Sequence, residues 1–244
     1  MAKILILSSR KKNNYYLINK LSERFEICFV IYERQSFKKK LKILKNRAKK
    51  LGFLKVIGQL LFLLLDRIYL SRFSKAGAIL GNPKKPGIPS KEIQDINSLE
   101  SGKIIEKIAP DLVIVSGTGI IKENILKLSR VFLNIHCGIT PKYRGVHGGF
   151  WAMSKKDFDN LGVTIHMVDK GIDTGKVIYQ SRILPEKDFR AIEARQYVKG
   201  SELMSKAVDD FINNRLKPVE SWTKESFLWH HPTILEYIKA WRNI

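Results

Sequence analysis

Three polar residues have the types and the order that acyl transfer needs. Asn134 and His136 lie at the end of a short apolar run, and Asp173 follows 37 residues after His136 in a glycine-flanked turn. Successive side chains of a strand alternate between faces, so Asn134 and His136 should point the same way. An amide or imidazolium N–H can stabilise the oxyanion of a tetrahedral intermediate, and a carboxylate can orient the imidazole. These three residues are our candidate catalytic set.

The same three residues also have an ordinary structural explanation. Asn134 could cap a strand end, His136 could occupy a turn, and Asp173 could form an Asx-turn. Residue types alone leave both explanations open.

The surrounding sequence predicts an α/β fold. Apolar runs that predict strands alternate with segments that predict helices at 15–24, 101–108 and 191–215. Residues 111–115 are apolar on both faces, as buried parallel strands are. Ligands of open α/β sheets bind outside the carboxyl ends of the strands, so the turn at 116–120 and the Asn134/His136 strand end should share one mouth.

Two segments resemble the signature of formyltransferases that use 10-formyltetrahydrofolate. One is Asn134-Ile135-His136 followed by Pro141-Lys142-Tyr143-Arg144-Gly145, and the other runs from 162 to 175. The resemblance covers roughly residues 110–183 well and the chain start weakly. It implies a Rossmann-like, open, mostly parallel twisted sheet with helices on both faces. It also implies amide transfer by Asn134, His136 and Asp173 without a metal.

The resemblance further implies which residues hold the two substrates. Two loops, 116–120 and 169–173, would bind the pterin through backbone hydrogen bonds. The expected folate contacts are Ser116, Gly117, Thr118, Gly119, Ile120, Asp169, Gly171 and Ile172. The expected acceptor contacts are Arg10, Lys11, Lys142, Tyr143, Arg144 and His147. Alternatives stay open, because the glycines also suit tight turns, the cations at 10–12 suit a solvated loop, and Arg144 could only pin its own loop.

The acceptor is less well specified than the donor. The family includes enzymes that formylate methionyl-tRNA, glycinamide ribonucleotide and amino sugars. Many members carry Ser-Leu-Leu-Pro after the histidine, where this chain has Gly138-Ile139-Thr140-Pro141. That variant, with the residues at 146–152, looks most like bacterial enzymes that formylate the 4-amino group of nucleotide-linked sugars such as GDP-perosamine. We therefore expect such a sugar as the acceptor, in surface polysaccharide synthesis.

Composition leaves several partner classes open. The 244 residues are 44% hydrophobic, which is typical of a globular protein, and the formal net charge is +21. So large a charge attracts polyanions such as nucleic acid, an acidic membrane face or phosphorylated small molecules. Cys28 and Cys137 predict neither a disulfide framework nor a zinc site, and they fit a reducing cytoplasm. The longest apolar stretch, 56–65, is too short to cross a bilayer.

A basic insertion and an aromatic tail flank the predicted catalytic core. We expect a catalytic domain at 1–217, with an amphipathic helical insertion at about 36–80, and a tail at 218–244. Residues 36–55 contain nine cations and no acid. They could form a helix pair that covers the sheet, contact anionic lipid at the membrane periphery, or bind a nucleotide, a partner or RNA. The aromatic tail should dock on the body or on a second subunit, as in a homodimer.

The tail also bears on the acceptor. It leaves no room for the additional domain that tRNA formyltransferases usually carry, so we expect no specific nucleic acid partner. A non-catalytic membrane- or RNA-binding relative, or a formyltransferase with another acceptor, remains the alternative. The His230-His231 pair lacks a third metal ligand nearby in sequence.

Overall fold

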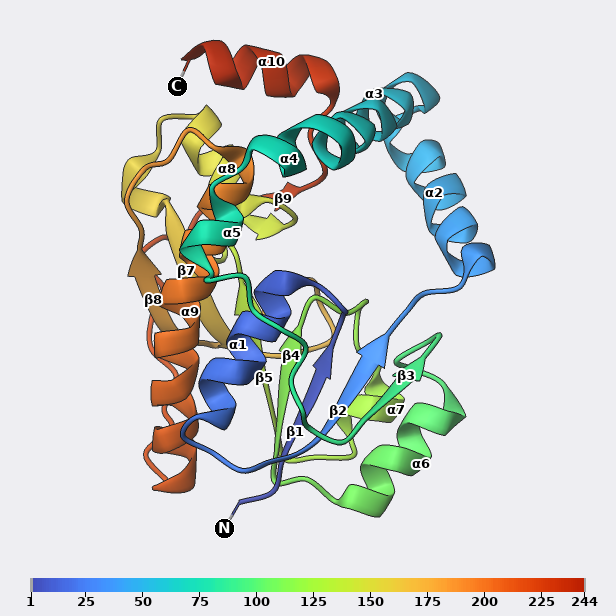
Figure 1. The fold of residues 1–244 in the computed structure, drawn as a ribbon, viewed down its shortest axis with the longest axis vertical. Coiled ribbons are helices and arrows are strands. Elements are labelled where there is room, and N and C mark those ends of the chain that lie inside the picture. Colours follow the sequence, from blue (N-terminus) through green and yellow to red (C-terminus); the bar gives the residue numbers. More distant parts are fainter. Residues whose placement is uncertain (1, 244) are drawn as a thin grey trace.

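A seven-stranded sheet forms the centre of the computed structural model, which describes residues 2–243. The strand order is β3-β2-β1-β4-β5-β7-β8 (Figure 1). The five parallel strands are β1 (Ile4–Ser8), β2 (Ile27–Glu33), β3 (Ser90–Ile93), β4 (Leu112–Ser116) and β5 (Val131–His136). β7 (Gly162–Met167) is antiparallel to β5, and β8 (Val177–Arg182) is antiparallel to β7.

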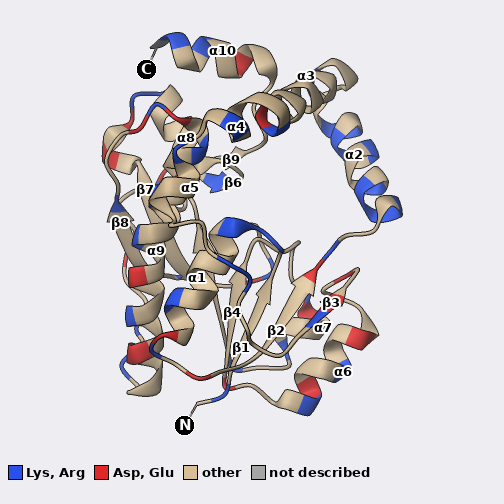
Figure 2. Cartoon of the chain, viewed as in Figure 1, with Lys and Arg blue, Asp and Glu red and all other residues tan. Residues whose placement is uncertain are grey.

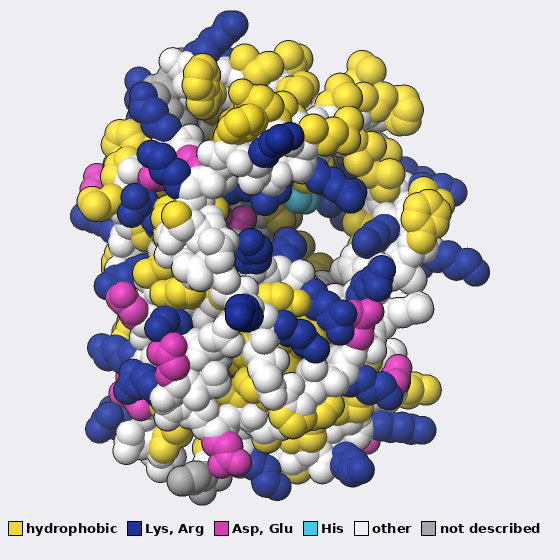
Figure 3. Space-filling view, viewed as in Figure 1, with side chains coloured by type: hydrophobic (Ala, Val, Ile, Leu, Met, Phe, Trp, Pro, Cys, Tyr) yellow, Lys and Arg dark blue, Asp and Glu magenta, His cyan; other side chains and the backbone are white. Residues whose placement is uncertain are grey.

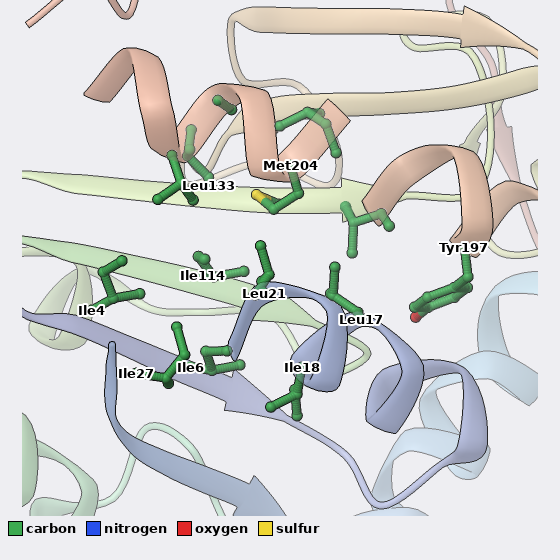
Figure 4. Close-up of a cluster of buried hydrophobic side chains, with 14 of the residues drawn as sticks. Ile4, Ile6, Leu17, Ile18, Leu21, Ile27, Ile114, Leu133, Tyr197 and Met204 are labelled. Atoms are coloured by element: carbon green, nitrogen blue, oxygen red, sulfur yellow. The ribbon is translucent and has the colours of Figure 1, made fainter. Parts of the chain in front are cut away.

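Apolar side chains alternate along the strands, so helices pack against both faces of this sheet. Ile4 and Ile6 of β1 belong to one core cluster, with α1 (Lys12–Ser22) and α9 (Phe189–Ile212), as Figure 4 shows. Leu5 and Leu7 belong to the cluster on the other face, with α6 (Leu99–Ile108) and α7 (Glu123–Leu126). The Rossmann-like, mostly parallel sheet expected from the sequence is therefore confirmed.

Residues 37–79 form an arm of helices that stands off the sheet (Figure 1). The arm comprises α2 (Phe37–Leu51), α3 (Phe53–Leu65), the π-helix η1 (Asp66–Leu70), α4 (Ser71–Phe73) and α5 (Ala76–Ile79). The Ser36 side chain caps α2 by accepting a hydrogen bond from the Lys39 backbone N–H. Gly52, with φ +88°, separates α2 from α3, because few residues other than glycine adopt that conformation.

The arm differs from one interpretation of the sequence. We considered a helix pair that covers the sheet, but α2 contains no buried residue. The buried residues of α3 are Val56, Gln59 and Phe62, and Gln59 donates a hydrogen bond to the His231 carbonyl of the tail. α2 is therefore mostly solvated, with Leu44, Arg47 and Leu51 half-buried, and α3 packs against the tail.

A third apolar cluster fastens the tail to the body. β9 (Leu228–Trp229) pairs with β6 (Arg144–Gly145), and α10 (Ile234–Asn243) packs near α3 and α8 (Gly148–Ser154). The Trp229 ring stacks on Trp151, with centroids 4.8 Å apart, and its indole N–H donates to the Lys142 carbonyl. A single turn of 3-10 helix, η2 (Phe158–Asn160), precedes β7.

The structure between residues 2 and 243 contains no helix that combines the length and apolar character needed to cross a membrane.

Candidate active site

The candidate catalytic residues come together where β5 ends. In the register of β5 and β7, Asn134 lies opposite His166 and His136 lies opposite Thr164. Asp173 belongs to the loop between β7 and β8, which returns to the same edge. One carboxylate oxygen of Asp173 lies 3.3 Å from Nδ1 of His136. Amide, imidazole and carboxylate thus share one site, as acyl transfer needs.

Both ring nitrogens of His136 contact protein atoms that the backbone positions. Nε2 of His136 lies 2.6 Å from the Tyr143 carbonyl oxygen, so Nε2 carries a hydrogen and donates it. The same Asp173 oxygen that faces Nδ1 accepts a hydrogen bond from the Gly145 backbone N–H at 2.8 Å. When Nδ1 is also protonated, the imidazolium is flanked by a carbonyl dipole and a carboxylate. This arrangement holds the ring in one orientation beside the reaction centre.

His166 joins this set, although the sequence alone does not single it out. Its Nδ1 lies 2.7 Å from the Met167 carbonyl oxygen and therefore carries a hydrogen. Its Nε2 lies 3.0 Å from the Asn134 side-chain nitrogen and 3.5 Å from the second oxygen of Asp173. His166 thus fixes the direction of the Asn134 amide. The motif at 162–175 contained the signal, because His166 and Thr164 alternate along one strand.

Asp173 is held in its ionised form. Burial alone would raise the pKa of its carboxyl, but the neighbouring rings of His136 and His166 and the Gly145 N–H outweigh burial and hold the pKa well below its usual range. The backbone at Asp173 has φ +51°, a conformation that Asp and Asn tolerate better than most residues. The carboxylate can therefore accept a proton only transiently.

The departure at Gly138 has a structural reason. A Cβ at this position would lie 2.5 Å from the Tyr143 carbonyl oxygen and 2.9 Å from Nε2 of His136. The 138–143 loop therefore closes on the His136 ring at a distance that leaves no room for a side chain. Thr164 stabilises the loop, since its hydroxyl donates to the Gly138 carbonyl at 2.7 Å.

The two loops expected to hold the pterin follow β4 and β7, and the second of them carries Asp173. Lys170 forms a 3.1 Å ion pair with Glu123, which links the 169–173 loop to the segment after the 116–120 loop. Ile120 and Ile172 expose apolar side chains on these loops. In the loop at 169–173, Asp169 accepts hydrogen bonds from the Gly171 N–H and from the Thr174 hydroxyl, and these bonds shape the turn.

Two of the expected folate contacts have other partners. The Gly119 N–H donates to Glu33 at 2.7 Å, so this donor is not free for a pterin. The Ser116 hydroxyl is buried and donates to the Asn14 side chain at 2.8 Å, so its role is to hold the loop. Gly117 takes φ +72°, and the Thr118 hydroxyl bonds the Gly119 carbonyl. Sequence could not reveal Glu33, because it lies 86 residues from Gly119.

The expected acceptor contacts near the catalytic loop divide in a similar way. The Tyr143 ring is fully buried and its hydroxyl donates to Asp157, which removes it from any substrate. Lys142 forms ion pairs with Asp157 and Glu225. Arg144 donates to the Ile172 carbonyl at 3.2 Å, which favours the alternative that it pins the loop.

The two cations before α1 occupy different positions. Arg10 forms a 2.9 Å ion pair with Glu92 and lies over the Tyr32 ring. Lys11 is exposed, and its charge is close enough to lower the pKa of both His147 and His231. Lys11 is therefore the expected acceptor contact that remains available beside the catalytic strand.

His147 has a protein partner in place of a substrate. Its Nε2 lies 3.0 Å from Nδ1 of His231, and its ring packs against Phe189. Burial, and then the charges of Lys11 and Arg190, lower the pKa of His147 to about 3. Burial, followed by neighbouring charges, likewise lowers the pKa of His231 to about 3. The neutral pair joins the catalytic loop to the tail.

Two other kinds of site do not coincide with the catalytic candidates. No group of three or more potential metal ligands occurs in the described part of the chain. A surface hollow of about 880 Å³ lies between β3 and the start of α2, and its lining contains none of the catalytic candidates.

Comparison with known proteins decides the family. A sequence model described as formyl transferase matches residues 85–208. The chain belongs to the formyl transferase family. Methionyl-tRNA formyltransferase from Finegoldia magna is 31% identical over 122 residues, which is 48% of this chain and 39% of that protein. This formyl transferase thus spans about two fifths of the length of that curated relative.

Solved structures support the fold of this formyl transferase. A 4-N formyltransferase from Francisella tularensis has a TM-score of 0.59 at 15% identity, covering 98% of this chain and 87% of that one. An N-formyltransferase from Helicobacter canadensis, in complex with folinic acid and dTDP-3-aminofucose, has a TM-score of 0.58 at 17% identity. The match covers 99% of this chain and 81% of that one. At these identities, the likeness concerns the fold.

Proposed function

We propose that this protein transfers a formyl group from 10-formyltetrahydrofolate to the amino group of a nucleotide-linked amino sugar. The observation that carries the proposal is the contact of Asp173 with His136, 3.3 Å apart, beside Asn134 at the end of β5. Membership of the formyl transferase family supports the reaction class. The sugar acceptor is supported by the Helicobacter canadensis relative, whose complex holds folinic acid and dTDP-3-aminofucose.

The folate supplies an activated formyl group, and the protein would bind it through the 116–120 and 169–173 loops. A neutral acceptor amine attacks the formyl carbon, and the carbonyl oxygen becomes an oxyanion. Asn134 has one amide hydrogen directed at His166, which leaves the other for the oxyanion. Protonated His136 adds positive charge beside it, although both of its nitrogens already face protein atoms.

Asp173 has two tasks in this mechanism. Its ionised carboxylate supports the imidazolium of His136, and it can move the proton that the attacking amine releases. The bond between the formyl carbon and the folate nitrogen then breaks, and that nitrogen takes the proton, so the charges balance. Neither a metal nor a covalent enzyme intermediate is required for this sequence.

A second candidate acceptor is methionyl-tRNA. Sequence relatives, including the Finegoldia magna protein, are named methionyl-tRNA formyltransferases. The net charge of +21 also suits a polyanionic acceptor. Against this, the similarity is confined to about half of this chain. Glycinamide ribonucleotide is a third acceptor within the same reaction class.

One experiment separates these acceptors. The purified protein is incubated with 10-formyltetrahydrofolate and, in parallel, with nucleotide-linked 4-amino and 3-amino sugars, methionyl-tRNA and glycinamide ribonucleotide. Mass spectrometry detects the added formyl group, and Asn134→Ala serves as the inactive control. We expect turnover with an amino sugar. Turnover only with methionyl-tRNA or glycinamide ribonucleotide would replace the proposed acceptor, and no turnover in any arm would refute the enzymatic proposal.

A further inference from the structure

The arm and α10 together expose an unusual amount of apolar surface. Large apolar side chains of α3, η1 and α10 point into solvent, and Figure 3 shows them gathered along the outer edge of the molecule over α3 and α10. Its most exposed members include Phe53 (71%), Leu54 (82%), Ile68 (65%), Leu235 (74%) and Trp241 (62%). We call this surface the apolar crest. Contiguous patches of this kind mark interaction or membrane sites, because water penalises them in a free monomer.

The helix next to the crest is strongly cationic. α2 has eight Lys and Arg residues and no acid, as Figure 2 shows by its blue ribbon. Lys39 pairs with Glu33 and Asp95, but Lys42, Lys45 and Lys49 are exposed and form no ion pair within the described residues. These three lie at helical spacings that bring like charges together, which destabilises a helix.

α2 also lacks the packing that usually stabilises a helix. Its 15 residues include none that is buried. Helices of about 12–15 residues are marginal in water without tertiary packing. A solvated helix with repelling cations therefore gains stability from an anionic partner.

Apolar crest and cationic helix together select the kind of partner. Nucleic acid would neutralise α2 but offers no apolar phase for Phe53 and Leu54. A second copy of the chain could cover the crest, but it would bring together two molecules of net charge +21. A bilayer with anionic headgroups offers both a negative surface and an apolar phase directly beneath it.

We propose that the apolar crest and α2 dock this protein on the surface of an anionic phospholipid bilayer. The crest side chains enter the boundary between headgroups and acyl chains, and the cations of α2 contact the headgroup phosphates. The carboxyl edge of the sheet lies under the arm (Figure 1), so the candidate active site would work close to the membrane surface. The proposal does not depend on which acceptor the enzyme uses.

Vesicle sedimentation with the full chain tests the proposal. Vesicles of phosphatidylcholine alone are compared with vesicles of equal parts phosphatidylcholine and phosphatidylglycerol. We expect binding to the anionic vesicles to be roughly tenfold or more tighter than to the neutral ones, and to weaken as salt is raised. Equal binding to both, or binding to neither, overturns the proposal.

Matched variants separate the two parts of the surface. Leu54→Glu with Leu64→Glu changes the crest, and Lys42→Glu with Lys45→Glu changes α2. Leu99→Glu with Leu184→Glu, and Lys103→Glu with Lys107→Glu, make the same changes at exposed sites on other elements. We expect both arm variants to lose roughly tenfold or more in vesicle affinity and both control variants to retain it. Retention of binding by the crest variant overturns the proposal.

Insertion can also be measured in the unaltered protein. Acyl chains carrying bromine should quench tryptophan fluorescence on anionic vesicles, and Trp241→Phe should remove most of that quenching, because Trp241 lies on the crest. Two further outcomes overturn the proposal in favour of another partner. One is binding of RNA that depends on α2 alone, without vesicle binding. The other is a dimer in sedimentation equilibrium that Leu54→Glu dissociates, again without vesicle binding.

Discussion

The carboxylate of Asp173 lies 3.3 Å from Nδ1 of His136, although 37 residues separate them in the chain. The intervening strand β7 runs antiparallel to β5, from Thr164 opposite His136 to Met167 opposite Leu133, and the loop after β7 folds back so that Asp173 reaches His136. The Gly145 N–H then holds the carboxylate at 2.8 Å. The contact therefore depends on the sheet and on the catalytic loop together.

Removal of either β5 side chain should stop turnover without unfolding the protein. We expect Asn134→Ala or His136→Ala to lower kcat by on the order of a hundredfold or more, because each removes a group that stabilises the oxyanion. Circular dichroism should report an unchanged fold. Full activity in either purified variant would contradict the assignment.

Asp173→Asn tests the charge of the carboxylate separately from its shape. Asn tolerates the left-handed conformation at this position, with φ +51°, and its carbonyl can still accept from Gly145. We expect kcat/KM to fall by roughly a hundredfold while the melting temperature stays near that of the wild type. A loss of less than about twofold would show that the negative charge is dispensable.

The closed 138–143 loop predicts sensitivity to a single methyl group. Gly138→Ala would place Cβ 2.5 Å from the Tyr143 carbonyl and so displace that carbonyl from His136. We expect a roughly tenfold or larger fall in kcat, since a small misplacement in a catalytic site is costly. Gly87→Ala is the matched control, because a Cβ there meets nothing within 4 Å. Equal kinetics in the two variants would rule out the tight loop.

The buried pair of His147 and His231 predicts acid sensitivity. In the folded protein the pKa of each ring is lowered to about 3, whereas an unfolded histidine has a pKa near 6.5. The unfolded state therefore binds more protons between these values, so stability is present above about pH 6.5 and is lost as the pH falls. The loss should reach up to about 1.4 kcal/mol per pH unit for each ring.

The titration of Asp173 does not overlap with that of the histidine pair. Its depressed pKa adds stability that is lost only below the ordinary range for Asp, near pH 4. Urea unfolding between pH 5 and 7 should thus report the histidine pair, and His231→Gln should give a shallower slope. An identical slope in that variant would show that the pair does not titrate on unfolding.

The tail should contribute stability through one of its tryptophans. Trp229 stacks on Trp151 and bonds the Lys142 carbonyl, so Trp229→Ala should destabilise the protein by about 3 kcal/mol. Trp222 is half exposed, and Trp222→Ala should cost under about 1 kcal/mol. Denaturant unfolding measures both. Equal losses would mean that the stacking on Trp151 contributes little.

Local patterns predicted the sheet and the catalytic candidates, because alternation and apolar runs are properties of short segments. The spacing of Asn134 and His136 placed both on one strand face, and the motif with Asp173 matched a known family. The partners of those residues were out of reach. His166 touches Asn134 only through strand register, and Glu33 reaches Gly119 only through the order of β2, β1 and β4.

The surroundings of the arm could not be predicted from the sequence either. Residues 36–55 look like a basic amphipathic helix that runs into the apolar 56–65 block, but Gly52 ends that helix early. No pattern revealed that α2 would stand free of the sheet. Likewise Tyr143 and His147 were expected at the acceptor, whereas tertiary packing buries one and pairs the other with the tail. Side-chain exposure is decided by elements that are distant in sequence.

Glu33 fixes the root of the arm to the body of the protein. Its buried carboxylate accepts from the Gly119 N–H and from Lys39 in the first turn of α2, so lifting that turn would strand a negative charge in the interior. The root of the arm is thereby clamped to the loop after β4. Gly52, whose surroundings are open, joins α2 to α3. The far side of Gly52 is held as well, because Gln59 and Phe62 of α3 are buried and Gln59 bonds the tail. The arm is thus fixed at both ends and keeps its place over the carboxyl edge of the sheet (Figure 1).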